Sequence, residues 1–168
     1  MSKLIEELQW RGLLQDATEG AAEHLAEAPR TGYIGFDPSA SSLHVGNLLV
    51  VMDLVHMQRY GHTPIALVGG GTGLIGDPSG KTAERQLLTK EIAAENAEGI
   101  RAQLAHFLDF DVKSNPAIMR NNLDWLGQLS LVDFLRDIGK HFSVNQLIAK
   151  ESVKRRLENE ETGLSYTE

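Results

Sequence analysis

The pattern of apolar and polar residues changes along the chain, and stretches with the period of a strand alternate with stretches with the period of a helix. Short apolar runs at residues 33–36 and 64–68 have the length of strands, and residues from about 44 to 60 have helical spacing. Gly61 is placed to end that helix, whose apolar positions include Leu48, Val51, Val55 and Met57. A strand, a helix and a second strand form the crossover unit of a parallel sheet.

The segment before this unit predicts a helix at the N-terminus. Ser2 is placed to cap it, and its apolar face is expected to carry Leu4, Ile5 and Leu8. Pro29 ends this region ahead of the first strand. The first strand is therefore preceded by helical structure that can pack on the rest of the domain.

The segment after the unit predicts a long helix, a third strand and two shorter helices. Thr89 is placed to cap the long helix, whose inward row we expect to be Ile92, Ile100, Leu104 and Phe107, and a strand at residues 117–120 follows. The last two helices are separated by Gly139, and each begins with the spacing of a capping box, Ser130 with Asp133 and Ser143 with Gln146. The pattern as a whole predicts an α/β domain with a parallel sheet and flanking helices.

Composition adds limits to this picture. A length of 168 residues suggests one domain, and the absence of cysteine excludes disulfides and thiolate metal sites. No apolar run approaches the ~18 residues of a membrane span, and the N-terminus lacks the apolar segment of a signal peptide. We therefore expect a soluble, cytoplasmic protein with no membrane partner. The net charge of −7 argues against a general nucleic-acid binder.

Two glycine-rich patterns imitate known nucleotide motifs. Residues 71–76 have the three spaced glycines of a dinucleotide fingerprint, but we expect residues 77–80 to continue a loop where that motif would open a helix. Residues 76–82 imitate a P-loop that is one residue too short between its glycines. A glycine-rich turn packed on the sheet would explain the glycines alone. Such a turn does not explain why Asp77, Lys81 and Arg85 cluster at the carboxyl end of a strand, where ligands bind in open α/β sheets.

The tetrapeptide at residues 44–47, His-Val-Gly-Asn, stands where the turn after the first strand opens a helix. The first N–H groups of a helix have no partner within it and the dipole is positive there, so a phosphate is favoured. Gly46 allows a ligand close to the backbone and His44 can donate to a phosphate oxygen. The alternative is a histidine at a helix start without a catalytic role. The other histidines have no metal-ligand spacing, and we expect no metal site.

Four stretches of the chain, at residues 6–13, 32–47, 66–81 and 134–145, resemble the class I aminoacyl-tRNA synthetases and, more narrowly, bacterial tyrosyl-tRNA synthetases. The resemblance covers essentially the whole chain. One position departs from it, because the family usually has a second histidine where this chain has Asn47. An asparagine amide can still donate a hydrogen bond to a ribose or phosphate oxygen, although it carries no charge.

The resemblance implies a Rossmann-like synthetase fold that is truncated. Residues 1–168 would form the N-terminal part of the catalytic domain, with connecting helices at about residues 84–160. The lysine-rich loop written KMSKS in the family and the anticodon-binding part would be absent. The implied reaction activates L-tyrosine with ATP, accompanied by Mg²⁺, and then transfers the tyrosyl group to tRNA(Tyr). A homodimer formed through the region around residues 134–142 and the final segment is also implied.

The resemblance also assigns roles to individual residues. Three sets of positions are implied, and the first two overlap: a catalytic set of Ser39, His44, Asn47, Lys81 and Arg85, an ATP-binding set of Gly35, Asp37, Ser39, His44, Gly46 and Asn47, and a tyrosine-binding set of Tyr33, Thr72, Asp77 and Asn122. Two of these residues have simpler alternatives, because Asp37 precedes a proline in a turn and Tyr33 could be an ordinary strand aromatic.

Two other functions remain open on the sequence. The chain could be a nucleotide-binding module that turns nothing over, which the absent lysine loop favours. It could also serve as an assembly fragment that dimerises. We expect ATP–pyrophosphate exchange to separate an enzyme from a binding module, and sedimentation to separate a dimerising fragment from a monomer.

Overall fold

The computed structural model describes residues 2–75, 88–150, 153–154 and 157. Its centre is a three-stranded parallel sheet of β1 (Thr31–Phe36), β2 (Thr63–Val68) and β3 (Ile118–Asn121), in the order β1-β2-β3. All three predicted strands are confirmed to within two residues at each end. In the register, Tyr33 pairs with Ile65 and Gly35 pairs with Leu67.

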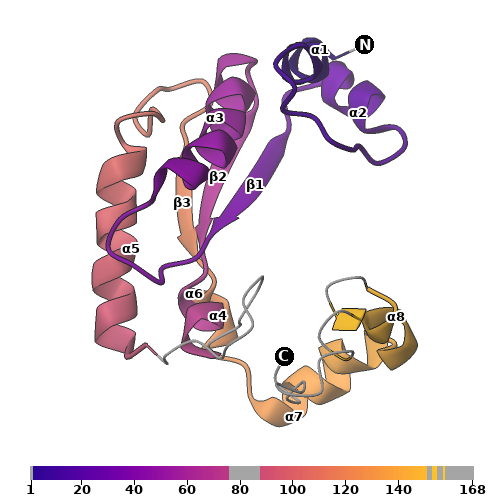
Figure 1. Ribbon diagram of the computed structural model, residues 1–168, viewed down its shortest axis with the longest axis vertical. Coiled ribbons are helices and arrows are strands. Elements are labelled where there is room, and N and C mark those ends of the chain that lie inside the picture. The colour runs from indigo at the N-terminus through magenta and orange to yellow at the C-terminus, as the bar shows by residue number, and fades with distance from the viewer. Residues whose placement is uncertain (1, 76–87, 151–152, 155–156, 158–168) are drawn as a thin grey trace.

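Two crossover helices pack on one face of this sheet (Figure 1). The helix α3 (Val45–Arg59) joins β1 to β2, and α5 (Lys90–Leu104) lies between β2 and β3 in the chain. Consecutive crossovers of one hand in the strand order β1-β2-β3 put both helices on the same side. The shared core consists of apolar residues from both helices, the strands and the segment after α5, namely Phe36, Val51, Leu54, Val55, Ala66, Ile100, Leu104, Leu108 and Ala117.

The ends of α3 and the start of α5 are as predicted. Gly61 follows α3 with φ of +85°, a left-handed conformation that favours glycine at the end of a helix. Thr89 caps α5, because its side chain accepts a hydrogen bond from the N–H of Ile92 at 3.3 Å. Both signals depend on residues that are close in sequence.

The predicted inward row of α5 is half wrong. Ile100 and Leu104 are fully buried, but Ile92 and Phe107 are about half exposed. The buried row is Ala93, Asn96, Ile100 and Leu104. A search for large apolar residues favours Ile92 over its small and polar neighbours, whereas the buried row contains the small Ala93 and the polar Asn96.

The N-terminal helices α1 (Lys3–Trp10) and α2 (Ala21–Glu27) precede the sheet, and α1 packs against α3. Leu4 and Ile5 are buried as predicted, and Ser2 occupies the N-cap position but makes no side-chain hydrogen bond to the helix. Glu7 accepts hydrogen bonds from Arg11 and from the Tyr60 hydroxyl, which ties α1 to the end of α3. These bonds, the one from Arg11 first, hold the pKa of Glu7 below its usual value.

A short helix, α4 (Gly70–Ile75), follows β2 directly. The prediction that the glycine-rich stretch at residues 71–76 belongs to a loop is wrong for the part up to Ile75, which is helical. The glycines at 71 and 73 lie inside this helix, so they do not make the tight turn that a dinucleotide fingerprint needs. The helix α6 (Leu123–Leu126) follows β3 and contacts α4.

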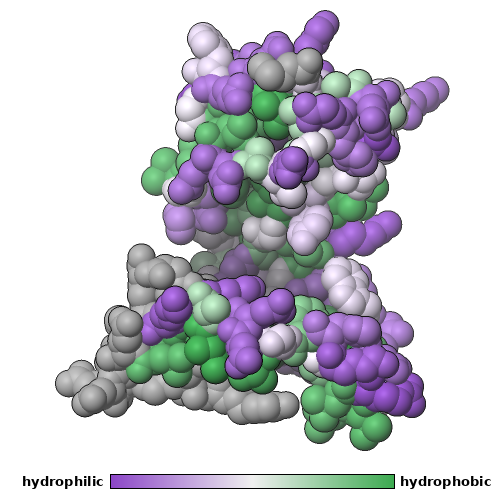
Figure 2. Space-filling view, turned by 90° about the vertical axis from the view of Figure 1, so that its right-hand side faces the viewer, coloured by the Kyte–Doolittle hydropathy of each residue, from purple (hydrophilic) through white to green (hydrophobic). Residues whose placement is uncertain are grey.

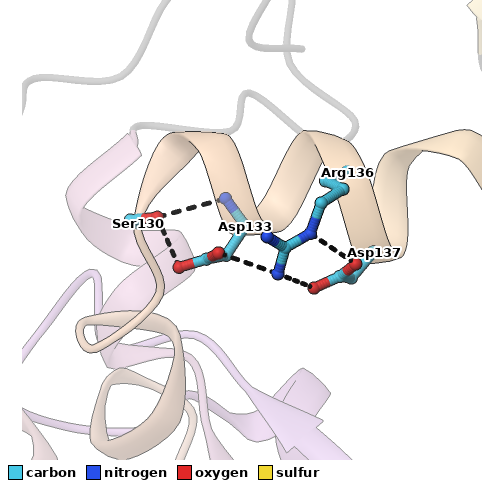
Figure 3. A network of polar contacts seen from close by, with 4 residues as sticks. All are labelled: Ser130, Asp133, Arg136 and Asp137. Carbon is cyan, nitrogen blue, oxygen red and sulfur yellow. Dashed lines mark hydrogen bonds and ion pairs between the residues drawn. The ribbon is translucent and has the colours of Figure 1, made fainter.

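The remaining helical turns project from the sheet (Figure 1). They are α7 (Leu131–Asp133), the π-helical η1 (Phe134–Ile138), the 3₁₀ turn η2 (Gly139–His141) and α8 (Val144–Ile148). The capping role of Ser130 is confirmed, since its Oγ accepts from the N–H of Asp133 at 3.1 Å (Figure 3). The capping box at Ser143 is wrong, because its side chain makes no capping bond.

Ion pairs lie on the surface of this projecting segment. Arg136 pairs with both Asp133 and Asp137, and donates to two oxygens of Asp137 at 2.8 and 2.6 Å (Figure 3). These hydrogen bonds hold the pKa of the exposed Asp137 below its usual value. Within the part of the chain that the structure describes, no helix is long and apolar enough to cross a membrane.

Truncating Leu54 tests the core between α3 and the sheet. Leu54 is 1% exposed, whereas Leu49 on the same helix is 60% exposed. We expect Leu54→Ala to lower the free energy of unfolding by about 2–5 kcal/mol, because a cavity replaces packed atoms. The matched change Leu49→Ala should stay within about 0.5 kcal/mol. Urea unfolding measures both, and equal losses would show that α3 is not docked as described.

Candidate functional site

The start of α3 carries the residues predicted to face a phosphate. His44 is the N-cap residue, and its Nδ1 accepts a hydrogen bond from the N–H of Gly46 at 3.0 Å. The Oδ1 of Asn47 in turn accepts from the N–H of His44 at 3.1 Å. The two side chains therefore form a reciprocal capping box at the first turn.

This capping determines which atoms of the two side chains can reach a ligand. A neutral imidazole that accepts at Nδ1 carries its hydrogen on Nε2, so the exposed His44 presents an N–H donor. The Asn47 amide oxygen is occupied, and its Nδ2 can still donate. His44 therefore caps the helix through Nδ1, and a ligand would meet the other ring nitrogen, Nε2.

A second group of predicted residues lies where β2 and β3 end. Asn122 is 9% exposed, its Oδ1 accepts from the N–H of Gly71 at 2.7 Å, and its Nδ2 donates to Thr72 Oγ1 at 3.2 Å. Gly73 on α4 lies beside Pro38 and the carboxylate of Asp37. The structure therefore brings Asp37, Thr72 and Asn122 to one edge of the sheet, where the carboxyl ends of the strands meet.

The other predicted residues of β1 lie on the sheet face opposite α3 and α5. Side chains alternate along a strand, and Phe36 is buried in the core, so Tyr33 and Gly35 point the other way. Tyr33 is 70% exposed, and a Cβ built at Gly35 would meet no atom within 4 Å. This face has room for a ligand beside β1. Ser39 is exposed in the loop that follows.

Three predicted site residues, Asp77, Lys81 and Arg85, lie outside the described residues. Among the residues that are described, no group of three or more histidines and acidic residues could hold a metal ion. The site that the structure describes thus consists of the loop at residues 37–44, the start of α3, α4, the end of β3 and the open face of β1.

Sequence reasoning missed two polar residues on α5 that contact the loop after β1. The buried Asn96 donates from Nδ2 to the carbonyl oxygen of Pro38 at 2.8 Å, and Gln103 Oε1 accepts from the N–H of Leu43 at 2.7 Å. Gln103 and His44 also line a common pocket of about 200 Å³ between α3 and α5. The available signal was an asparagine in the inward row of an amphipathic helix, because a buried polar group needs a hydrogen-bond partner.

Comparison with known proteins decides the family. The family model for class I tRNA synthetases (W and Y) matches residues 25–168. The chain belongs to this family. The tyrosine–tRNA ligase of Roseiflexus castenholzii is 56% identical over 168 residues, which are all of this chain and 39% of that protein. The ligase of Pectobacterium atrosepticum is 55% identical over 99% of this chain and 40% of its own length.

Solved structures agree on the fold. The C-terminally truncated mitochondrial tyrosyl-tRNA synthetase of Aspergillus nidulans matches with a TM-score of 0.79 at 24% identity, over 99% of this chain and 50% of that one. The predicted class I synthetase fold is thereby confirmed. The chain spans 39% of the length of the Roseiflexus castenholzii relative.

Asn47 provides a test of the capping box. Asn47→Ala removes the acceptor of the His44 N–H bond, and we expect the free energy of unfolding to fall by about 1 kcal/mol. Asn47→Asp keeps an acceptor and adds a negative charge at a helix N-terminus, so its stability should equal or exceed that of the parent. Thermal or urea unfolding of both variants decides the point. If Asn47→Asp loses as much stability as Asn47→Ala, the capping bond does not stabilise α3.

Proposed function

We propose that the chain forms the tyrosine- and ATP-binding part of a cytoplasmic tyrosine–tRNA ligase. The observation that carries this proposal is its identity of 51–56% to tyrosine–tRNA ligases over essentially its full length. The described geometry supports the same function, because hydrogen-bond donors at a helix start lie at the carboxyl edge of a parallel sheet. The tyrosine carboxylate would attack the α-phosphorus of ATP, giving tyrosyl-adenylate and pyrophosphate.

The chemistry of this step matches the kind of residues at the site. A carboxylate is already nucleophilic at neutral pH, so the reaction needs no general base. Catalysis must then come from alignment of the two substrates and from stabilisation of charge on the departing pyrophosphate. Neutral hydrogen-bond donors, a helix N-terminus and cationic side chains supply both effects.

The ATP side of the site is assigned to the start of α3, to the loop at residues 37–44 and to Lys81 and Arg85. His44 through Nε2, with Ser39, would contact the phosphates that move away, and the substrate would enter as its Mg²⁺ complex. Lys81 and Arg85 would meet the pyrophosphate. The sugar and the α-phosphate would be held by Gly35, Asp37, Gly46 and Asn47.

The tyrosine side is assigned to the open face of β1 and the edge beside it. Tyr33 would reach the substrate phenol, and Asp77 would face its ammonium group. Thr72 and Asn122 would line the pocket. Since both polar atoms of the Asn122 amide already bond to α4, this residue would act mainly by holding α4 and Thr72 in place.

Transfer of the tyrosyl group to tRNA(Tyr) is proposed for a protein of full family length. The net charge of −7 makes this chain a poor surface for RNA by itself. A nucleotide-binding module without turnover is the alternative. ATP–pyrophosphate exchange by the chain alone would distinguish the two.

We also propose a homodimer formed through the projecting helices. No described residue from Leu129 to Lys150 is buried, although this stretch contains many large apolar side chains. Leu131 and Val132 are each 69% exposed, and Figure 2 shows apolar surface over the lower part of the molecule, where this stretch lies. An exposed apolar surface of this kind supports an interface between two copies of the chain.

Substitution of His44 tests the ATP site. His44→Asn keeps an oxygen that can cap α3 but loses the imidazole Nε2 donor, whereas His44→Ala loses both. In a chimera where this chain replaces the matched part of the Roseiflexus castenholzii ligase, both variants should slow tyrosyl-adenylate formation by about 10- to 10³-fold. Affinity for tyrosine should stay nearly unchanged, and His44→Asn should unfold at the parent temperature. A parent-like rate for His44→Asn would show that His44 only caps the helix.

A charge on the projecting helices tests the dimer. We expect Leu131→Glu to shift the chain towards monomer, because a buried carboxylate without a partner opposes association. Trp10→Glu is the matched control, since Trp10 is 77% exposed on α1 and lies outside the proposed interface. Sedimentation velocity at several concentrations measures the effect. A monomeric parent, or equal effects of the two substitutions, would contradict the proposal.

A further inference from the structure

One face of α5 contacts the backbone of the loop between β1 and α3 at three points. Asn96 donates to the carbonyl oxygen of Pro38 at 2.8 Å, and Gln103 accepts from the N–H of Leu43 at 2.7 Å. Between these two residues Gly99 lies directly against the carbonyl oxygen of Ser41, so closely that a Cβ would collide with it. Residues 96, 99 and 103 follow one another at helical spacing, so a single face of α5 supports the loop from Pro38 to Leu43.

The direction of each hydrogen bond follows from chemistry. A carbonyl oxygen only accepts, so the Asn96 amide must present its NH₂ group to Pro38, and a backbone N–H only donates, so Gln103 must present its oxygen to Leu43. Asn96 is 7% exposed, and an unpaired amide there would cost free energy. Each contact therefore requires a side chain of the right kind at its position, a donor at residue 96 and an acceptor at residue 103.

The loop uses backbone groups for these contacts and leaves its polar side chains exposed. Asp37, Ser39 and His44 are all exposed, and Pro38 between them is fully buried. The loop is thus held from the side of α5 and is open to solvent through its side chains. Figure 1 shows the loop passing between the end of β1 and α3 beside α5.

We propose that Asn96, Gly99 and Gln103 are positioning residues that set the loop at residues 37–44 for the phosphates of ATP. This role rests on the proposed function, because it concerns the loop that would bind ATP. The three residues act through the backbone of Pro38, Ser41 and Leu43 and do not touch the substrate. A displacement of about 1 Å in such a loop can lower the rate by about 10²-fold, since alignment supplies much of the catalysis.

Hydrogen exchange at the Leu43 amide tests the contact itself. In the 168-residue chain, Gln103→Met should speed exchange of this amide by about 3- to 10-fold, because the acceptor is lost. Gln103→Glu keeps an acceptor oxygen and should retain protection. Arg101→Met, at an exposed position of the same helix, is the control and should change nothing. Equal exchange in the parent and in Gln103→Met would overturn the inference.

Replacing the amide with a carboxylate should have the opposite result at Asn96, where protection should be lost, to that at Gln103, where Gln103→Glu should keep it. Asn96→Asp replaces the donor with an acceptor that faces a carbonyl oxygen, so loop amides should lose protection although the side chain keeps its shape. If Asn96→Asp retains loop protection while α5 remains folded, as judged by exchange within the helix, the polarity argument is wrong. Gly99→Ala, which places a methyl group against Ser41, should also release the loop.

Kinetics of the chimera described above test the link to ATP. We expect Gln103→Met to lower kcat/KM for ATP by about 10- to 100-fold, with KM for tyrosine within about twofold of the parent. An active parent with unchanged ATP kinetics in Gln103→Met would overturn this inference alone. A parent chimera without tyrosine-dependent ATP–pyrophosphate exchange would overturn the proposed function and the positioning role with it, whereas the hydrogen-exchange result would still report the contact.

Discussion

One face of the parallel sheet is buried under α3 and α5, and this packing determines where the other elements and the candidate site lie. Consecutive crossovers in the order β1-β2-β3 place both helices on the same side, so the opposite face of β1 stays open around Tyr33 and Gly35. The same crossovers direct the loop after β1, the helix α4 and the end of β3 to one edge. The core therefore positions the candidate site without contributing a side chain to it.

Several residues of the candidate site have their side chains occupied in the fold, and two of them keep a free donor that the proposed function assigns to ATP. His44 caps α3 through Nδ1 and keeps an N–H on Nε2, and Asn47 caps through its oxygen and keeps its NH₂ group. Asn122 uses both ends of its amide to join β3 to α4. An alanine substitution at these positions removes a bond of the fold together with any proposed ligand contact, so variants that keep one hydrogen bond are more informative.

Local signals explain most of what could be predicted. The starts of α3, α5 and α7 depend on bonds between residues two or three positions apart, such as Thr89 with Ile92 and Ser130 with Asp133. The spacing of a capping box did not predict a capping bond correctly at Ser143, whose side chain makes none. The prediction of a loop at Gly71 and Gly73 is wrong, because the N–H of Gly71 donates to the Asn122 side chain and Gly73 lies beside Pro38, contacts that no local pattern shows.

The strands, the crossover helices and the family could be predicted from the amino-acid sequence, because hydrophobic period, helix caps and motifs depend on residues that are close together in the chain. The residues of α5 that are buried, and the groups that its polar side chains contact, depend instead on tertiary packing. Asn96 and Gln103 bond to backbone groups that lie 58 and 60 residues away in the chain. Contacts over such separations depend on how α5 packs beside the loop, and the pattern of neighbouring residues does not predict how one element packs against another.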